Sequence, residues 1–200
     1  MRDECMTALL AGHETTGATL AWWMWELARQ PEIQAEVSAE ACRILRGRVP
    51  TAADAPALTA LHRSLEETLR LHPAAPLLST RCAIRPVTVG PWQLPAGTLL
   101  LLPVQLAQHD AQAFAQPDTF CPVRFAERDA STHPHWLPFG LGPRVCLGQH
   151  QAMMMLTILA ALLAQRFSWR AAANQPAPQP LLQVSCRPDV LWLDIIQRAS

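Results

Sequence analysis

One cysteine stands in a glycine-rich segment immediately before a long apolar run. Residues 139–148 read FGLGPRVCLG, and the cysteine is Cys146. Three glycines allow backbone angles and close approaches that a Cβ would block: Gly140, Gly142 and Gly148. The following residues, 147–166, are predicted to form a helix, whose free N–H groups and dipole favour a thiolate at its N-terminus. Cys146 is therefore a candidate metal ligand, although a lone cysteine is also a common small buried side chain.

Arg144 stands two residues before this cysteine. Its guanidinium is a planar fork of donors that suits a carboxylate. Haem could bind both side chains, because its iron accepts an axial sulfur and its edge carries two propionates. The pattern favours a haem site with Cys146 on the iron.

The segment resembles the haem-ligand motif F-x-x-G-x-R-x-C-x-G of the cytochrome P450 family, the haem-thiolate monooxygenases. The resemblance implies haem b (iron protoporphyrin IX), with Cys146 as its axial iron ligand. It also implies that the rest of the segment contacts the cofactor, namely Phe139, Gly140, Gly142, Arg144 and Gly148.

A second cluster, residues 11–16 (AGHETT), lies inside the first predicted helix, where a glycine costs about 1 kcal/mol relative to alanine. The Thr15 hydroxyl can bond the carbonyl four residues earlier and open the helix locally. A helix–helix contact would also explain the small residues. The cluster resembles the family's oxygen-activation motif A-G-x-(D/E)-T-(T/S). In that reading Ala11 and Gly12 leave room for O2, while Thr15 and Glu14 deliver protons as catalytic residues.

Glu67 and Arg70 lie three residues apart on the third predicted helix, so they share a face. A solvated surface pair has the same spacing. The surrounding ETLRLHP resembles the family's E-T-L-R-x-x-P segment, which implies a structural role, and Arg124 of the P-V-R-F segment is the expected third member. The family usually has glutamate where this chain has Val123.

Two further positions complete the candidate site. The resemblance places Arg81 at a haem propionate, although it is also compatible with a surface arginine on a strand. Cys146 and His150 could share a zinc ion, but a structural zinc site needs four ligands.

Composition restricts the class of protein. The 200 residues are 50% hydrophobic and carry no net charge, which excludes a nucleic-acid footprint. The six cysteines form no C-x-x-C pair, so a reducing compartment is expected. Neither a signal peptide nor a bilayer-spanning run is visible, and we expect a cytoplasmic protein of the soluble bacterial type. A membrane anchor in an absent N-terminal half remains an open alternative.

The predicted fold is mainly α with small β-sheets (α+β), as the resemblance to the C-terminal half of the P450 fold implies. Helices are expected at 3–29, 31–46, 57–71 and 147–166. Short strands are expected within 79–102 and 181–196, an irregular meander at 116–138, and a linker at 171–180.

The first helix is apolar on more than one face, which is typical of a helix at the centre of a larger protein. We therefore expect residues 1–200 to be the C-terminal part of a single catalytic domain, and the isolated chain to be poorly soluble or molten.

The resemblance implies a monooxygenase that activates O2 and inserts one oxygen atom into a small, apolar organic substrate. Electrons would come from NAD(P)H through a reductase or ferredoxin. The alternatives are a truncated, non-catalytic remnant with weak or no haem binding, and a zinc-bound interaction module.

Overall fold

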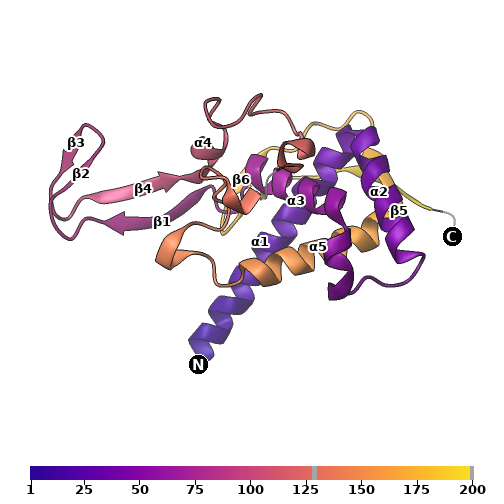
Figure 1. The fold of residues 1–200 in the computed structure, drawn as a ribbon, viewed down its shortest axis with the longest axis horizontal. Helices are drawn as coiled ribbons and strands as arrows, with labels where there is room; N and C mark the ends of the chain where they lie inside the picture. Colours follow the sequence, from indigo (N-terminus) through magenta and orange to yellow (C-terminus); the bar gives the residue numbers. More distant parts are fainter. Residues whose placement is uncertain (128–129, 199–200) are drawn as a thin grey trace.

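A long helix, α1 (Arg2–Arg29), crosses the molecule and is followed after one residue by α2 (Pro31–Leu45) (Figure 1). The computed structural model describes residues 1–127 and 130–198. Proline ends the first helix because its ring excludes the helical conformation of the preceding residue, and it is tolerated at the first position of the second. Both predicted helices are confirmed to within one residue.

The third helix, α3 (Thr59–Leu71), begins two residues later than predicted, because a 3₁₀ turn over Ala52–Ala57 precedes it. Glu40 of α2 accepts hydrogen bonds from the amides of Ala60 and Leu61, at 3.0 and 2.9 Å. These are among the first N–H groups of α3, which have no partner within the helix. A side chain from α2 thus caps the start of α3.

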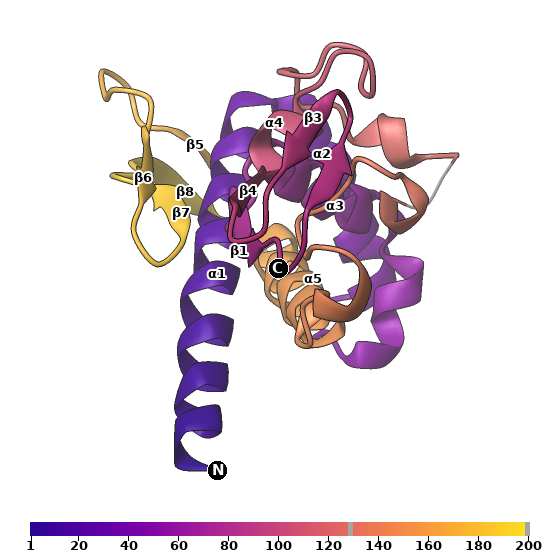
Figure 2. The same cartoon turned by 90° about the vertical axis from the view of Figure 1, so that its left-hand side faces the viewer.

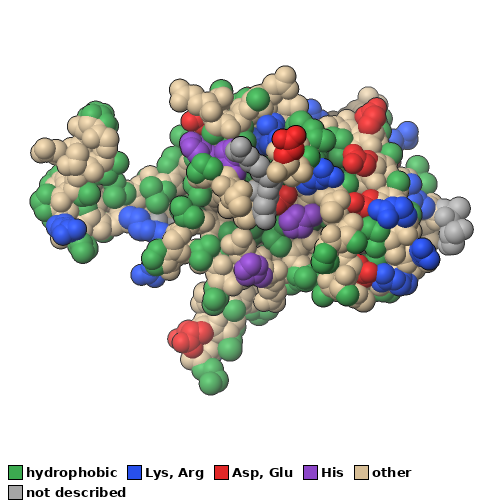
Figure 3. All heavy atoms as spheres, viewed as in Figure 1, with side chains coloured by type: hydrophobic (Ala, Val, Ile, Leu, Met, Phe, Trp, Pro, Cys, Tyr) green, Lys and Arg blue, Asp and Glu red, His purple; other side chains and the backbone are tan. Residues whose placement is uncertain are grey.

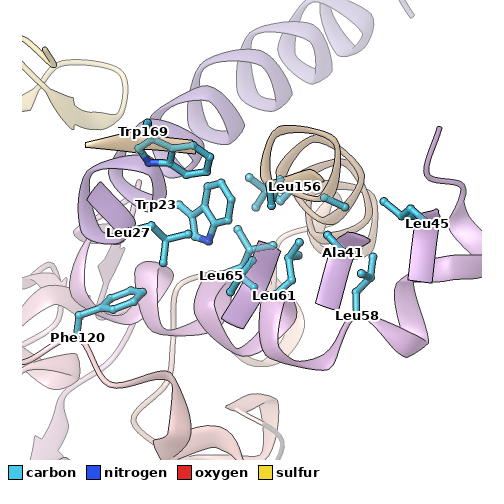
Figure 4. Close-up of a cluster of buried hydrophobic side chains, with 14 of the residues drawn as sticks. Trp23, Leu27, Ala41, Leu45, Leu58, Leu61, Leu65, Phe120, Leu156 and Trp169 are labelled. Atoms are coloured by element: carbon cyan, nitrogen blue, oxygen red, sulfur yellow. The ribbon is translucent and has the colours of Figure 1, made fainter. Parts of the chain in front are cut away.

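The fourth long helix, α5 (Gln149–Arg166), packs against α1, α2 and α3. Figure 4 shows apolar side chains from all four helices meeting in one core, which also receives Trp169 from the strand that follows α5. Its fully buried members include Trp23, Leu27, Leu45, Leu58, Leu61, Leu65 and Leu156. This core fixes the crossing of α1 and α5.

Between α3 and α5 the chain forms an arm of short strands. β1 (Leu77–Cys82) pairs antiparallel with β4 (Leu99–Pro103), and β2 (Val87–Val89) pairs with β3 (Trp92–Leu94) at the far end. The arm projects from the helices (Figure 1). The strands predicted within 79–102 are confirmed.

The stretch between β4 and α5 begins with a short helix, α4 (Val104–Gln108), and its described residues then form turns, bends and short 3₁₀ segments. The 3₁₀ segments cover Pro122–Phe125, Ala130–Thr132 and Gly142–Arg144. The predicted irregular meander at 116–138 is therefore confirmed, except for residues 128 and 129, which lie outside the described ranges.

The C-terminal strands differ from the prediction. β5 (Phe167–Ala171) pairs with β8 (Leu193–Gln197), while β6 (Pro180–Leu182) pairs with β7 (Cys186–Pro188). Strands predicted within 181–196 are therefore confirmed, the linker predicted at 171–180 is one residue too long at each end, and β5 was not predicted. It follows α5 without a turn, so no break in the sequence marks it.

The N-terminal half of α1 stands out from the body (Figure 2). Residues 1–13 are all exposed, including Leu9 and Leu10. In Figure 3 exposed hydrophobic side chains lie along both this half-helix and the projecting arm, among polar atoms. None of the described helices is long and apolar enough to cross a membrane.

Candidate functional site

The cysteine loop, residues 139–148, folds back on itself. The amide of Cys146 donates to the carbonyl of Phe139 at 2.8 Å, and the amide of Val145 donates to that of Gly142 at 3.0 Å. Gly140 and Gly142 have φ angles of +75° and +70°, which a side chain would strain. The two glycines thus permit the return that brings residue 146 beside residue 139.

The start of the following helix corrects the prediction. α5 begins at Gln149 rather than Leu147, and the amide of Gln149 donates to the carbonyl of Cys146 at 3.3 Å. The cysteine therefore lies in the turn before the helix. Leu147 and Gly148 lie between the cysteine and α5, and a Cβ at Gly148 would lie 4.0 Å from the cysteine sulfur.

The polar groups of the loop have no partners in the described part of the chain. The Cys146 thiol is exposed and takes part in no hydrogen bond there, and the exposed Arg144 guanidinium forms neither a hydrogen bond nor an ion pair. Leu141, Val145 and Leu147 are exposed beside them. A soft sulfur donor, an unpaired cation and apolar surface together fit a flat, apolar group with anionic edges, so these residues fit haem.

The loop packs against β1. A Cβ at Gly140 would lie 3.6 Å from the side chain of Leu78, which is ordinary van der Waals contact. Arg81 lies on the same strand, half-buried and paired in the ladder with Leu100. In Figure 1 the loop lies below the β1–β4 ladder. The structure thus places the ligand loop next to the strand that carries Arg81.

On α1 the Thr15 hydroxyl donates to the carbonyl of Ala11 at 2.6 Å. α1 nevertheless continues unbroken from Arg2 to Arg29, so the expected local opening of the helix is wrong. This single hydrogen bond from the hydroxyl to the carbonyl four residues earlier does not interrupt the helix. Ala11 and Gly12 are exposed, and no atom lies within 4 Å of a Cβ placed on Gly12. No helix contact within the described chain accounts for this glycine.

Glu14 is half-buried and reaches a distant segment. Its Oε1 accepts a hydrogen bond from the hydroxyl of Ser185 at 3.3 Å. Ser185 is fully buried in the turn between β6 and β7, and the next carbonyl, that of Cys186, accepts from Trp22 Nε1 at 3.2 Å. No local pattern predicts this contact, because its partners lie 171 residues apart in the sequence.

Glu67, Arg70 and Arg124 form one buried network. Both oxygens of Glu67 accept from Arg70, through Nε and Nη2 at 2.9 Å each, and Oε1 also accepts from Arg124 Nε at 2.9 Å. The Cys121 amide donates to the same oxygen at 2.9 Å. Glu67 and Arg70 are completely buried, and four donors surround the carboxylate. Val123 is exposed, so its replacement of the family's glutamate leaves the network intact.

The arginines of this network also hold the irregular segment in place. Arg70 Nη1 donates to the carbonyls of Gln108 and Pro117, at 2.8 and 2.7 Å. Arg124 Nη1 donates to that of Ala115 at 3.0 Å. These bonds satisfy carbonyls in a stretch that lacks a β-ladder, and they fix its path.

Two residues that the sequence analysis did not single out connect this network with the cysteine loop. The side-chain amide of Gln108 joins α3 to the amide of Leu137, and Trp136 Nε1 donates to the carbonyl of Glu66 at 3.1 Å. Trp136 also contacts Phe139, edge to face, with ring centroids 6.1 Å apart. The aromatic residues flanking a glycine-rich loop were a sequence signal for such an anchor.

The alternative of a zinc-bound interaction module requires a set of metal ligands, which the described residues do not provide. Across residues 1–127 and 130–198, no three histidine, cysteine, aspartate or glutamate side chains are grouped to hold a metal ion. His150 is exposed one residue into α5.

Comparison with known proteins agrees with this architecture. The cytochrome P450 family model matches residues 1–191. A cytokinin hydroxylase of Arabidopsis thaliana is 35% identical over 174 residues, which are 86% of this chain and 34% of the relative. Cyclooctatin synthase of Streptomyces melanosporofaciens is 35% identical over 191 residues, 94% of this chain and 41% of the relative.

A solved structure of a zebrafish cytochrome P450 with progesterone superposes with a TM-score of 0.85 at 33% identity. The match covers 96% of this chain and 44% of that structure. The chain therefore belongs to the cytochrome P450 family. It spans about a third of the length of the cytokinin hydroxylase and less than half of the other two proteins.

Proposed function

We propose that this chain carries the oxygen-activating part of a haem-dependent monooxygenase. The observation that supports this most directly is the exposed Cys146 thiol, on a loop where neither this thiol nor the Arg144 guanidinium has a partner within residues 1–127 and 130–198. In a chain of this family, such a pair suits an axial iron ligand and a propionate partner. Membership of the family makes the monooxygenase class the leading proposal.

The residues that would hold haem b are those of the cysteine loop and the neighbouring strand. Cys146 would bind the iron, Arg144 and Arg81 would pair with the propionates, and the loop would lie along the cofactor through Phe139 and its three glycines. The extra donors of the planar guanidinium suit a carboxylate better than an ammonium would. When bound, a thiolate-ligated haem supplies reductive activation of O2.

Glu14 and Thr15 would supply the protons. The Thr15 hydroxyl already donates to the Ala11 carbonyl at 2.6 Å, so its oxygen remains able to accept a proton or a hydrogen bond. Glu14 is the adjacent ionisable group on the helix, and exposed Ala11 and Gly12 leave space beside them. A hydroxyl and an ionisable carboxyl at consecutive positions of one helix are groups that general acid chemistry can use.

The overall reaction consumes O2, two electrons and two protons. One oxygen atom enters a C–H bond of a small, apolar organic substrate to give an alcohol, and the other leaves as water. The electrons would come from NAD(P)H through a reductase or ferredoxin. All six cysteines are free thiols, which supports a reducing, cytoplasmic compartment.

Haem titration of the purified chain tests the proposal. We expect a saturable complex whose reduced carbon monoxide form has the Soret band of a thiolate-ligated haem. Cys146→Ala should abolish that band, whereas Cys42→Ala, at another exposed cysteine, should keep it.

The same titration tests the remnant alternative. The chain spans about a third of the cytokinin hydroxylase, and a protein that cannot enclose haem should bind it weakly and without saturation. Nonspecific binding that survives Cys146→Ala would favour the remnant and refute the ligand assignment.

A further inference from the structure

Gln108, the last residue of α4, is completely buried, and its side chain bonds in two directions. Its Nε2 donates to the carbonyls of Leu69 and Arg70, at 3.0 and 2.9 Å. Its Oε1 accepts from the amide of Leu137 at 2.7 Å. Both N–H groups and the oxygen of the side-chain amide therefore form hydrogen bonds.

The first pair of bonds completes the end of α3. The last four carbonyls of a helix have no partner within it, and here the residue after His72 is Pro73, which has no N–H to offer. The carbonyl of Thr68 is satisfied by the amide of His72 at 2.7 Å. Gln108 satisfies the next two, so a side chain from α4 acts as the C-terminal cap of α3.

The third bond leads to the cysteine loop. Leu137 stands two residues before Phe139, and its carbonyl accepts from the amide of Gly140 at 3.0 Å. The carbonyl of Phe139 in turn accepts from the amide of Cys146 at 2.8 Å. From the Gln108 side chain, which is itself bonded to the end of α3, three hydrogen bonds therefore lead through Leu137 to the backbone of the cysteine.

The same residue is tied to the buried polar network. The backbone carbonyl of Gln108 accepts from Arg70 Nη1 at 2.8 Å, and Arg70 pairs with Glu67. Movement of α4 would therefore disturb the network and the loop together. Only a primary amide supplies two N–H donors and an oxygen acceptor at this reach, since a carboxylate lacks the donors and an apolar chain lacks both.

We propose that Gln108 is a positioning residue for Cys146: it holds the start of the cysteine loop at a fixed place on the end of α3. The inference rests on the proposed function of Cys146 as haem ligand. It assigns to α3 and α4 the task of setting where the sulfur lies before haem is bound.

Gln108→Met removes all three side-chain bonds with little change in volume. Gln105→Met is the matched control, because Gln105 is on the same short helix and its side chain forms no hydrogen bond within the described residues. The first readout is amide hydrogen exchange of the full chain without haem. We expect exchange at Leu137 and Cys146 to accelerate by about tenfold or more, while amides of residues 156–164 in α5 change by less than about twofold.

The second readout is the spectrum after haem loading. In Gln108→Met we expect part of the reduced carbon monoxide complex to lose the thiolate-type Soret band, with the control retaining it. Faster exchange throughout the chain, or no change at Leu137 and Cys146, would overturn the proposal, because either result would show a general structural role or none.

Gln108→Glu provides a second variant should the methionine variant fail to fold. It keeps an oxygen for the Leu137 amide and loses the donors to α3, so we expect faster exchange at His72 with less change at Leu137. Equal acceleration at both sites would contradict the two-ended link. A wild-type chain that never shows the thiolate band would refute the haem assignment, while the exchange data would still decide the role of Gln108.

Discussion

The Glu67–Arg70–Arg124 network and the cysteine loop differ in the burial and in the partners of their polar groups. In the network a completely buried carboxylate is surrounded by four donors, and the arginines continue to backbone carbonyls. In the loop the Cys146 thiol and the Arg144 guanidinium are exposed, and neither has a partner among the described residues. The first region is completed by this chain alone, and the second presents its groups outward.

The difference separates stability from chemistry. A buried ion pair is costly to desolvate and becomes strongly destabilising when one partner is removed. An exposed thiol or guanidinium contributes little to folding, but it remains available to a ligand. We therefore expect substitutions in the network to unfold the chain, and substitutions in the loop to change what it binds.

The largest effect should follow from Glu67→Gln. It leaves the buried Arg70 without its counter-ion, which costs about 3–5 kcal/mol of unfolding free energy, measured by urea titration. Asp194→Asn is the control, since it breaks the exposed 3.2 Å pair with Arg170 and should cost only about 0–1 kcal/mol. Similar losses in both variants would remove the distinction between buried and exposed pairs.

Arg144→Ala should have an intermediate effect, confined to the ligand. Loss of one charge-assisted hydrogen bond to a propionate costs about 1.5–3 kcal/mol, so we expect haem affinity to fall by about 10- to 100-fold. Absorbance titration measures it, with the exposed Arg43→Ala on α2 as the control. An unchanged affinity would mean that the free guanidinium serves no anionic group.

Asp54 lies between the two extremes, and its contribution should depend on pH. The Arg48 side chain, the Thr51 amide and the Thr51 hydroxyl bond its carboxylate and hold its pKa well below the ordinary 3.8. A depressed pKa stabilises the folded state above the unfolded pKa, and this stabilisation disappears as the pH falls through the folded pKa.

The urea midpoints of wild type and Asp54→Asn should therefore differ most near neutral pH and converge in acid. Measurements at about pH 7, 4, 3 and 2 test this, because the difference is constant above the ordinary pKa of 3.8 and is lost only between that value and the lower pKa of the folded state. A difference that grows in acid would reverse the predicted sign.

The smallest effect on stability should come from Cys146→Ser. Because the thiol is exposed and bonds to nothing in the described chain, we expect the unfolding free energy to change by less than about 0.5 kcal/mol. The thiolate-type Soret band should nevertheless disappear. A destabilisation as large as that of Glu67→Gln would show that the sulfur is a structural element.

Local signals in the sequence predicted most of the elements. Pro31 and Pro73 mark helix ends, and the glycine and proline turns between 79 and 102 separate the short strands, because each restricts its own backbone. The ligand loop was equally visible, since its chemistry is carried by neighbouring residues. Such features need no knowledge of distant contacts.

Features made by distant contacts were not predictable in this way. β5 exists because its backbone pairs with β8, and Gln34 of α2 bonds both the amide and the carbonyl of Trp169. Gln108 reads as an ordinary polar residue of a short helix, and its role depends on carbonyls 38 and 39 residues earlier. A helix cap formed by a side chain distant in the sequence cannot be predicted, because no local pattern identifies its hydrogen-bond partners.

The contacts between α1 and the C-terminal strands can form only after the ribosome has synthesised those strands. Trp169 Nε1 donates to the carbonyl of Met24 at 2.8 Å across 145 residues, and Trp22 Nε1 bonds the carbonyl of Cys186 across 164. At about 5–20 residues per second, the ribosome needs on the order of 7–30 s to add the first of these separations. During that interval the first helix can already pack against α2 and α3, for example through the 2.8 Å bond from Trp23 Nε1 to the Ser64 hydroxyl, but the part of α1 that receives Trp169 and the C-terminal strands stays uncovered.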